Sequence, residues 1–166
     1  MELMKAIRDR RSIRKYKPDP VPEKEIGYVL EAARLAPSWG NRQCWRYIVV
    51  TDEALRKRIT QRDWAAQAPV VIVGCADPAK AGNKDGKPYY MLDMGISMEH
   101  LMLAATERGL GTCWIGGQFD EKTVKEALGV PENIRVVALT PLGYPDEAPP
   151  AKERKSMGET ISRNKW

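Results

Sequence analysis

The segment that most constrains the fold is an uninterrupted apolar run at residues 69–75, Pro-Val-Val-Ile-Val-Gly-Cys. The run has the length of a β-strand, and strands that are covered on both faces have continuous apolar sequences of this kind. The chain must therefore cover two faces of a sheet. With 166 residues, 43% of them hydrophobic, it is long enough for one full core, so we expect a single domain over residues 1–166.

Apolar residues at helical spacing predict helices at residues 2–10, 22–36, 52–59, 89–108 and 120–128. β-Branched and aromatic runs predict further strands at residues 47–50, 112–115 and 134–139. We expect a mobile loop at residues 77–87, which are rich in Gly and Lys, and an extended arm at the proline-rich residues 141–150. The alternation of strands and helices indicates an α+β or α/β class with a central sheet covered by helices. The methionines of the long helix, between Met91 and Met102, are expected in the core or at a dimer interface.

The cysteine and histidine contents argue against metal and disulfide chemistry. Cys44, Cys75 and Cys113 lie far apart, so we interpret each as a small buried hydrophobe rather than as part of a disulfide framework or metal cluster. His100 is the single histidine, and we expect no metal site. No positively charged stretch leads into an apolar run near residue 1, and no apolar run reaches the roughly 20 residues that span a bilayer, so we expect no signal peptide and a cytoplasmic protein.

The formal net charge of +5 is compatible with nucleic acid, a membrane surface or a phosphorylated small molecule as a partner. Most basic residues are interleaved with acids, which disfavours a nucleic-acid groove. Basic residues concentrate in two places, at residues 8–17 and at residues 152–155. Two basic groups near opposite ends of a compact domain can converge on one phosphate.

Three motifs carry groups suited to a phosphorylated ring ligand, although each alone is also typical of an ordinary turn or helix end. Arg10-Arg11-Ser12-Ile13-Arg14 offers guanidinium groups, which bind phosphate oxygens bidentately, and a hydroxyl. Residues 37–45 offer amides that can donate and accept, as an isoalloxazine edge requires. The Gly-rich residues 109–117 allow a flat ligand to approach the backbone. They follow a predicted helix and precede a strand, which is the reverse of a dinucleotide-binding glycine motif, so we expect no Rossmann site.

In this order, the segments resemble the nitroreductase-like family of flavoproteins. Residues 10–16 (Arg-Arg-Ser-Ile-Arg-Lys-Tyr) and 36–38 (Ala-Pro-Ser) resemble the opening of the family. Residues 41–47 resemble its Asn-x-Gln-Pro-Trp segment. The family's long interface helix and the turn that follows it are matched in this chain by residues 92–97, 103–105 and 109–112. The resemblance covers nearly the whole chain.

The resemblance implies an α+β fold with a mostly antiparallel central sheet covered by helices, and an intertwined homodimer with two FMN sites at its interface. It also implies an enzyme that moves hydride from NADH or NADPH through flavin N5 to a small electron-poor acceptor, such as a nitroaromatic or a quinone, in a ping-pong cycle. The flavin carries this chemistry, so no side chain is expected to act as a catalytic acid or base. Neither nucleic acid nor a membrane is expected as a partner.

The resemblance further implies which residues hold FMN. One subunit would hold the phosphate, the ribityl chain and the pyrimidine edge with its two basic segments, through Arg10, Arg11, Ser12, Arg14, Lys152 and Arg154. The other subunit would contribute Pro37, Ser38, Trp39 and Asn41. One flavin face would be lined by Ile115, Gly116 and Gly117, and the pyrimidine ring would lie near Gln61. Arg14 would also stabilise negative charge on the reduced flavin.

Three residues depart from the family pattern. Cys44 replaces a proline, Gly116 stands where several members have a glutamate, and Trp39 is bulky where small residues are common. The chain also lacks room for the helical insertion that covers the site in longer members. Two other functions stay open: a flavin- or nucleotide-binding sensor without turnover, and reductive dehalogenation or flavin fragmentation on the same fold. Reduction of bound flavin by a nicotinamide distinguishes the reductase from the sensor.

Overall fold

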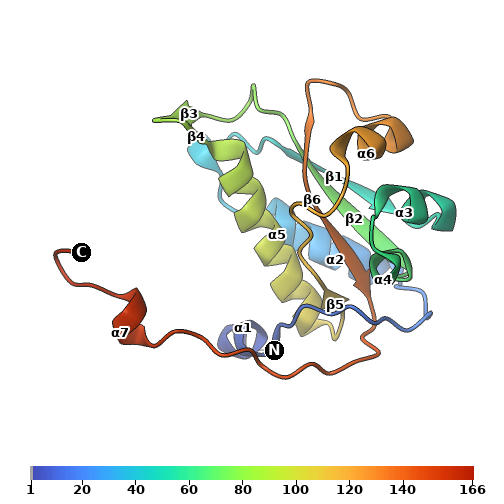
Figure 1. Ribbon diagram of the computed structural model, residues 1–166, viewed down its shortest axis with the longest axis horizontal. Coiled ribbons are helices and arrows are strands. Elements are labelled where there is room, and N and C mark those ends of the chain that lie inside the picture. Colours follow the sequence, from blue (N-terminus) through green and yellow to red (C-terminus); the bar gives the residue numbers. More distant parts are fainter. Residues whose placement is uncertain (1) are drawn as a thin grey trace.

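The computed structural model describes residues 2–166 (Figure 1). Its helices are α1 (Leu3–Asp9), α2 (Glu23–Arg34), α3 (Glu53–Ile59), α4 (Asp63–Ala66), α5 (Tyr89–Glu107), α6 (Glu121–Leu128) and α7 (Met157–Thr160), with a 3-10 turn, η1 (Trp39–Asn41). Its strands are β1 (Trp45–Val50), β2 (Val70–Ala76), β3 (Asn83–Lys84), β4 (Lys87–Pro88), β5 (Gly111–Thr112) and β6 (Arg135–Gly143). The main sheet has four strands in the order β1-β2-β6-β5, and β3 pairs with β4 in a separate hairpin. Every neighbouring pair is antiparallel, as the resemblance implied.

The strand β2 is buried along its whole length and divides the core into two layers. Val70 and Ile72 belong to the core formed with α2 and α5, whereas Val71 and Val73 belong to the core formed with α3, α4 and α6. Figure 1 shows these two groups of helices on opposite sides of the sheet. The prediction that the apolar run is covered on both faces is confirmed.

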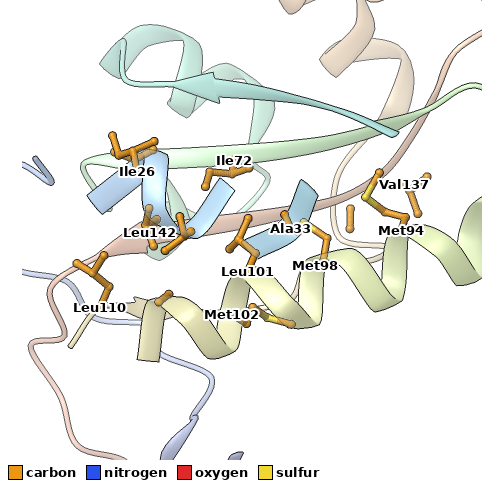
Figure 2. Packing of buried hydrophobic residues seen from close by; sticks show 14 of the residues in the cluster. Ile26, Ala33, Ile72, Met94, Met98, Leu101, Met102, Leu110, Val137 and Leu142 are labelled. Atoms are coloured by element: carbon orange, nitrogen blue, oxygen red, sulfur yellow. The ribbon is translucent and has the colours of Figure 1, made fainter. Parts of the chain in front are cut away.

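The helix α5 packs closely on the sheet because β2 has a glycine beneath it. A Cβ atom on Gly74 would lie 2.7 Å from the Met94 sulfur, so the Met94 side chain occupies the space that a larger residue at this position would need. Met94, Met98 and Met102 are buried in the core (Figure 2). Met91 is 51% exposed, so the methionines of this helix divide between the core and the surface.

The helix boundaries agree with local sequence signals. The Asp52 carboxylate accepts the Leu55 backbone N–H at 2.8 Å at the start of α3, and Asp120 accepts the Thr123 N–H at 2.7 Å at the start of α6. The helix α6 ends at Gly129, whose φ of 65° lies in the left-handed region that favours glycine. Within residues 2–166 no helix is both long and apolar enough to cross a bilayer.

The final strand is longer than predicted. β6 continues through Pro141, which pairs with Val71 of β2, so the extended arm begins only after Gly143. Proline has no N–H to donate to a ladder. Beside it, the Thr140 hydroxyl accepts the Cys113 N–H at 3.2 Å. Pairing with the long β2 thus overrides the local effect of the proline.

Two further predicted segments differ from the structure. The strand expected at residues 112–115 is limited to β5, and Ile115 makes only a single bridge to Leu139. Residues 77–87, expected as a loop, contain the β3–β4 hairpin. Asp85 and Gly86 turn this hairpin with φ angles of 54° and 73°, as two-residue hairpin turns require.

After β6 the chain runs back along the N-terminal segment. The Lys17 N–H donates to the Tyr144 carbonyl at 2.9 Å, and the Arg14 N–H donates to the Glu147 carboxylate. Residues 148–166 then lead away from the sheet and carry α7 (Figure 1). The C-terminal arm therefore starts beside the segment that follows α1.

Candidate functional site

The two basic segments of the sequence meet at one surface cavity of about 630 Å³. Small-molecule sites usually have volumes of about 300–1,000 Å³. The cavity is lined by Ile7, Arg8, Asp9, Arg10, Arg11, Ser12, Arg14, Pro149, Pro150, Ala151, Lys152 and Arg154, and we call it the basic cavity. It includes every residue that the sequence assigned to the phosphate end of the site. The predicted convergence of the two chain ends is therefore present in the structure.

The segment after α1 is held in place by β5. Ser12 forms a bridge with Thr112, and the Ile13 N–H donates to the Thr112 carbonyl at 2.9 Å. A Cβ atom on Gly111 would lie 2.8 Å from the Ile13 side chain, so a glycine is needed for Ile13 to sit there. The basic side chains that flank Ile13 are thus presented from an extended backbone that is fixed to the sheet.

Most of the positive charge in the basic cavity is not neutralised. The Arg10 Nε atom lies 3.5 Å from a carboxylate oxygen of Glu99 in α5. Burial raises the pKa of Glu99, while the nearby Arg10 lowers it. Within residues 2–166 no ion pair is formed by the other predicted cations, Arg11, Arg14, Lys152 and Arg154. The cavity is therefore suited to an anion with more than one negative charge.

Two buried groups lie beside Ser12. Burial raises the pKa of the Cys113 thiol, although Arg14, Ser12 and Arg10 act in the opposite direction, so the thiol is protonated near neutral pH. The Thr112 hydroxyl is fully buried and has no hydrogen-bond partner within residues 2–166. All three cysteines are buried and free, which confirms their interpretation as small packed side chains.

The loop at residues 37–44 is anchored by a buried carboxylate. Asp93 of α5 is 3% exposed and accepts the Trp39 N–H at 2.9 Å and the Cys44 thiol at 3.7 Å. Burial and the Asp93 charge raise the pKa of Cys44 to about 11. The Gln43 N–H donates to the Ser38 hydroxyl at 2.9 Å, which closes the loop. The substitution of a family proline by Cys44 thus adds a contact to the anchor.

The Trp39 ring packs within its own chain. Its centroid lies 5.6 Å from that of Tyr89, with the two planes at 27°, and the Arg42 guanidinium lies 4.6 Å from its centroid. A Cβ atom on Gly82 would lie 2.7 Å from the indole. Although bulky, Trp39 is only 37% exposed, because its neighbours cover most of the ring.

The loop and the basic cavity lie toward opposite ends of α5. In Figure 1 the turn that contains η1 lies beside the N-terminal end of α5, and α1 lies near its C-terminal end. Within the described chain, none of residues 37–43 lines the basic cavity. The assignment of this loop to the site of a second subunit stays a prediction.

The stretch at residues 115–117 combines a buried residue with two glycines. Ile115 is 3% exposed, and its N–H and carbonyl both bond to Leu139 at 2.9 Å. A Cβ atom on Gly116 would lie 2.5 Å from the Trp114 indole nitrogen, which explains the glycine at this departure from the family pattern. Gly117 has open space around its Cα. The side chain of Ile115 faces the core, and the glycines form the accessible surface.

Gln61 lies on the exposed connection between α3 and α4. Close by in sequence, Trp64 of α4 has its ring centroid 5.7 Å from the Arg14 guanidinium carbon. The structure thus brings the segment of Gln61 toward the basic cavity through Trp64. Within residues 2–166 Gln61 does not line the basic cavity, so its assigned role stays a prediction.

Sequence reasoning missed the residues that orient the site. The Asp93 carboxylate accepts a hydrogen bond from the loop at residues 37–44. Glu99 pairs with Arg10, and Glu147 accepts the Arg14 backbone N–H. Only Asp93 carries a sequence signal, because it is a lone carboxylate among apolar residues in a helix predicted to be buried. The other two acids look like ordinary surface residues.

The sequence profile of the nitroreductase family matches residues 7–66 and 60–144. The chain belongs to the nitroreductase family. A relative from Archaeoglobus fulgidus, provisionally named NADH dehydrogenase/NAD(P)H nitroreductase, is 36% identical over 174 residues. The alignment covers 99% of this chain and 99% of that relative, so the similarity extends through both basic segments.

Solved structures of nitroreductase-family proteins have the same fold. A member from Clostridium difficile superimposes with a TM-score of 0.90 at 29% identity and covers 100% of both chains. The NADPH:FMN oxidoreductase of Vibrio harveyi, solved in complex with NAD+, superimposes with a TM-score of 0.90 at 28% identity, over 99% of this chain and 77% of that one. The α+β nitroreductase-like fold predicted from the resemblance is confirmed.

Proposed function

We propose that this nitroreductase-family protein is an FMN-dependent oxidoreductase that transfers hydride from NADH or NADPH to a small electron-poor acceptor, such as a nitroaromatic or a quinone, in a ping-pong cycle. The observation that carries the proposal is the convergence of both basic segments on one cavity of about 630 Å³. The Vibrio harveyi neighbour supports the choice of cofactor and donor, because its name gives FMN and NADPH and it was solved with NAD+.

The basic cavity fits the phosphate of FMN. A phosphate monoester carries a charge of about −1.5 to −2 at neutral pH. Four side chains of the cavity form no ion pair within residues 2–166 and can neutralise that charge: those of Arg11, Arg14, Lys152 and Arg154. Guanidinium groups bind phosphate oxygens bidentately, and the Ser12 hydroxyl adds a further donor. The cations and the hydroxyl that line the basic cavity therefore match what a phosphate monoester requires.

The stretch at residues 115–117 is suited to a flat ring. Gly117 presents backbone with open space around it, while Ile115 supports the stretch from the core. When bound, FMN supplies the hydride-transfer chemistry. Arg14 is held against Trp64 and by the Ser12 carbonyl at 3.4 Å, so its charge can stabilise a negative ring edge. The role of the protein is to bind, orient and tune the ring.

A homodimer completes the proposed site. The C-terminal arm carries three exposed apolar residues, Met157, Ile161 and Trp166, and α5 exposes Met91 and Leu92, each at 51%. Apolar side chains gathered on an arm and on a helix face are typical of surfaces that a partner covers. In the proposed dimer the loop at residues 37–41 of one subunit contacts the flavin held by the other. The proposed activity is consistent with a cytoplasmic location.

FMN titration of the flavin-free protein tests the proposal. Removal of two phosphate contacts in Lys152→Ala/Arg154→Ala is expected to raise the Kd for FMN at least about tenfold, which corresponds to roughly 1.4 kcal/mol. The matched control Lys57→Ala/Lys122→Ala removes the same charge from α3 and α6 and should leave the Kd unchanged. Arg14→Ala is expected to lower flavin occupancy and to slow its reduction. Equal Kd values for all variants would contradict the assignment of the basic cavity.

A further inference from the structure

The β3–β4 hairpin, residues 83–88, is fixed to the loop that we assign to the flavin site. The Tyr89 N–H donates to the Gly82 carbonyl at 3.0 Å and closes the base of the hairpin. Gly82 packs on the Trp39 indole, where a Cβ atom would lie 2.7 Å from the ring. Figure 1 shows the hairpin projecting past the N-terminal end of α5, beside the turn that contains η1. Trp39 thus connects the hairpin to the proposed ring-binding region.

The hairpin presents a concentration of positive charge. Lys84 and Lys87 are directly opposite each other across the turn, and both are exposed. Like charges in such a cross-strand pair are destabilising unless a counter-charge is near. The only acid of the hairpin is Asp85, and within the part of the chain that the structure describes neither lysine forms an ion pair, whereas the neighbouring Lys80 pairs with Asp77 at 3.9 Å.

A third cation lies at the same indole. The Arg42 guanidinium lies 4.6 Å from the Trp39 ring centroid, an arrangement that keeps the cation at the ring by cation–π attraction. Lys84 is two residues beyond Gly82, so its Cα lies within about 7 Å of the Gly82 Cα. Arg42 thus lies at the Trp39 ring, and the two hairpin lysines extend from the segment that begins at Gly82, which packs on the same ring. None of these three cations lines the basic cavity.

We propose that Arg42 and the two hairpin lysines bind a phosphate group of the reduced dinucleotide. The proposal rests on the proposed function, in which the Trp39 loop lies at the flavin ring where the donor must react. A dinucleotide that stacks its nicotinamide there extends its anionic remainder outward, and the hairpin offers an exposed anion site next to that position. The 2′-phosphate of NADPH and the pyrophosphate shared by NADH and NADPH have the same recognition chemistry, and kinetics separate them.

The test compares Lys84→Gln/Lys87→Gln with the matched control Lys57→Gln/Lys122→Gln in the FMN-loaded protein. Steady-state kcat and KM are measured for NADPH and for NADH at low and high ionic strength. We expect the hairpin variant to raise the donor KM at least tenfold at low ionic strength, with kcat changed less than twofold. The KM of the wild type should rise with salt, whereas that of the hairpin variant should be nearly independent of salt. Reoxidation of the dithionite-reduced hairpin variant by a quinone should match the wild type, because the acceptor has no phosphate.

Each outcome decides the inference. A KM increase for NADPH alone assigns the site to the 2′-phosphate, and equal increases for both donors assign it to the pyrophosphate. A KM that matches the control variant for both donors overturns the inference while leaving the proposed function intact. A wild-type flavoprotein that neither donor reduces would overturn the proposed function, and the inference with it. Slower quinone reoxidation in the hairpin variant would also overturn a donor-specific role.

Discussion

At the scale of single residues, Asp93 shows how a buried carboxylate can position a loop without touching a ligand. It is almost fully buried in α5, and its two oxygens accept the Trp39 N–H and the Cys44 thiol. Buried polar groups are costly unless they are hydrogen-bonded, so the carboxylate and the loop stabilise each other. The conformation of the loop thus depends on a residue of the central helix.

The substitution Asp93→Ala is expected to lower the free energy of unfolding by about 1–3 kcal/mol, because the Trp39 N–H loses its acceptor. Asp93→Asn keeps an acceptor oxygen and should lose less than half as much. Urea denaturation of the two variants and the wild type measures the difference. If the alanine and asparagine variants unfold at the same urea concentration, the hydrogen bond to Trp39 is not what anchors the loop.

The basic residues of the site could be predicted from sequence, whereas their orienting partners could not. Arg10 and Arg14 stand out because they belong to a run of cations without acids. Glu99 and Glu147 act on that run from positions about 90 and 130 residues away in the chain, and only the tertiary fold brings them there. The chemistry of this site is therefore readable locally, but its geometry is not.

At the scale of elements, the contact between β5 and the segment after α1 determines where the basic side chains lie. Gly111 provides the space in which Ile13 packs, and the Ile13 N–H bonds to Thr112. Ile13 lies between Ser12 and Arg14, so any displacement of this segment moves two residues of the proposed phosphate site.

We expect Gly111→Ala to lower the free energy of unfolding by about 1–3 kcal/mol, since a methyl group would overpack against Ile13. It should also weaken FMN binding, because the displaced segment carries Ser12 and Arg14. Gly27→Ala is the matched control: it adds a methyl group to an exposed helix position with no atom within 4 Å. That control should raise stability by up to about 1 kcal/mol. Denaturant unfolding and FMN titration of both variants test the prediction, and equal FMN affinity in Gly111→Ala and the wild type would contradict it.

The elements that could be predicted are those with local signals. Asp52 and Asp120 cap their helices by accepting N–H groups three residues further along the chain, and Gly129 ends α6 by its own conformation. The extension of β6 through Pro141 depends instead on pairing with β2, and the hairpin after Gly82 depends on packing against Trp39. Such long-range contacts override local propensity, so sequence patterns do not reveal them.

At the scale of the whole molecule, the fold brings the two ends of the chain to one cavity. The charge pattern indicated this meeting, because two basic segments can converge on one phosphate. The structure shows how the two ends are brought together: residues 144–147 run along the segment after α1 before the C-terminal arm leads away (Figure 1). The homodimer that would use this arm stays a prediction, since it depends on a second chain.

The most direct test of the central claim is an anaerobic absorbance spectrum of the purified protein loaded with FMN, recorded before and after addition of NADH or NADPH. We predict that the flavin bands bleach with at least one donor and recover when a nitroaromatic or a quinone is added. Bands that neither donor bleaches would contradict the reductase function and favour a sensor. A protein that retains no flavin after incubation with FMN would contradict the cofactor site itself.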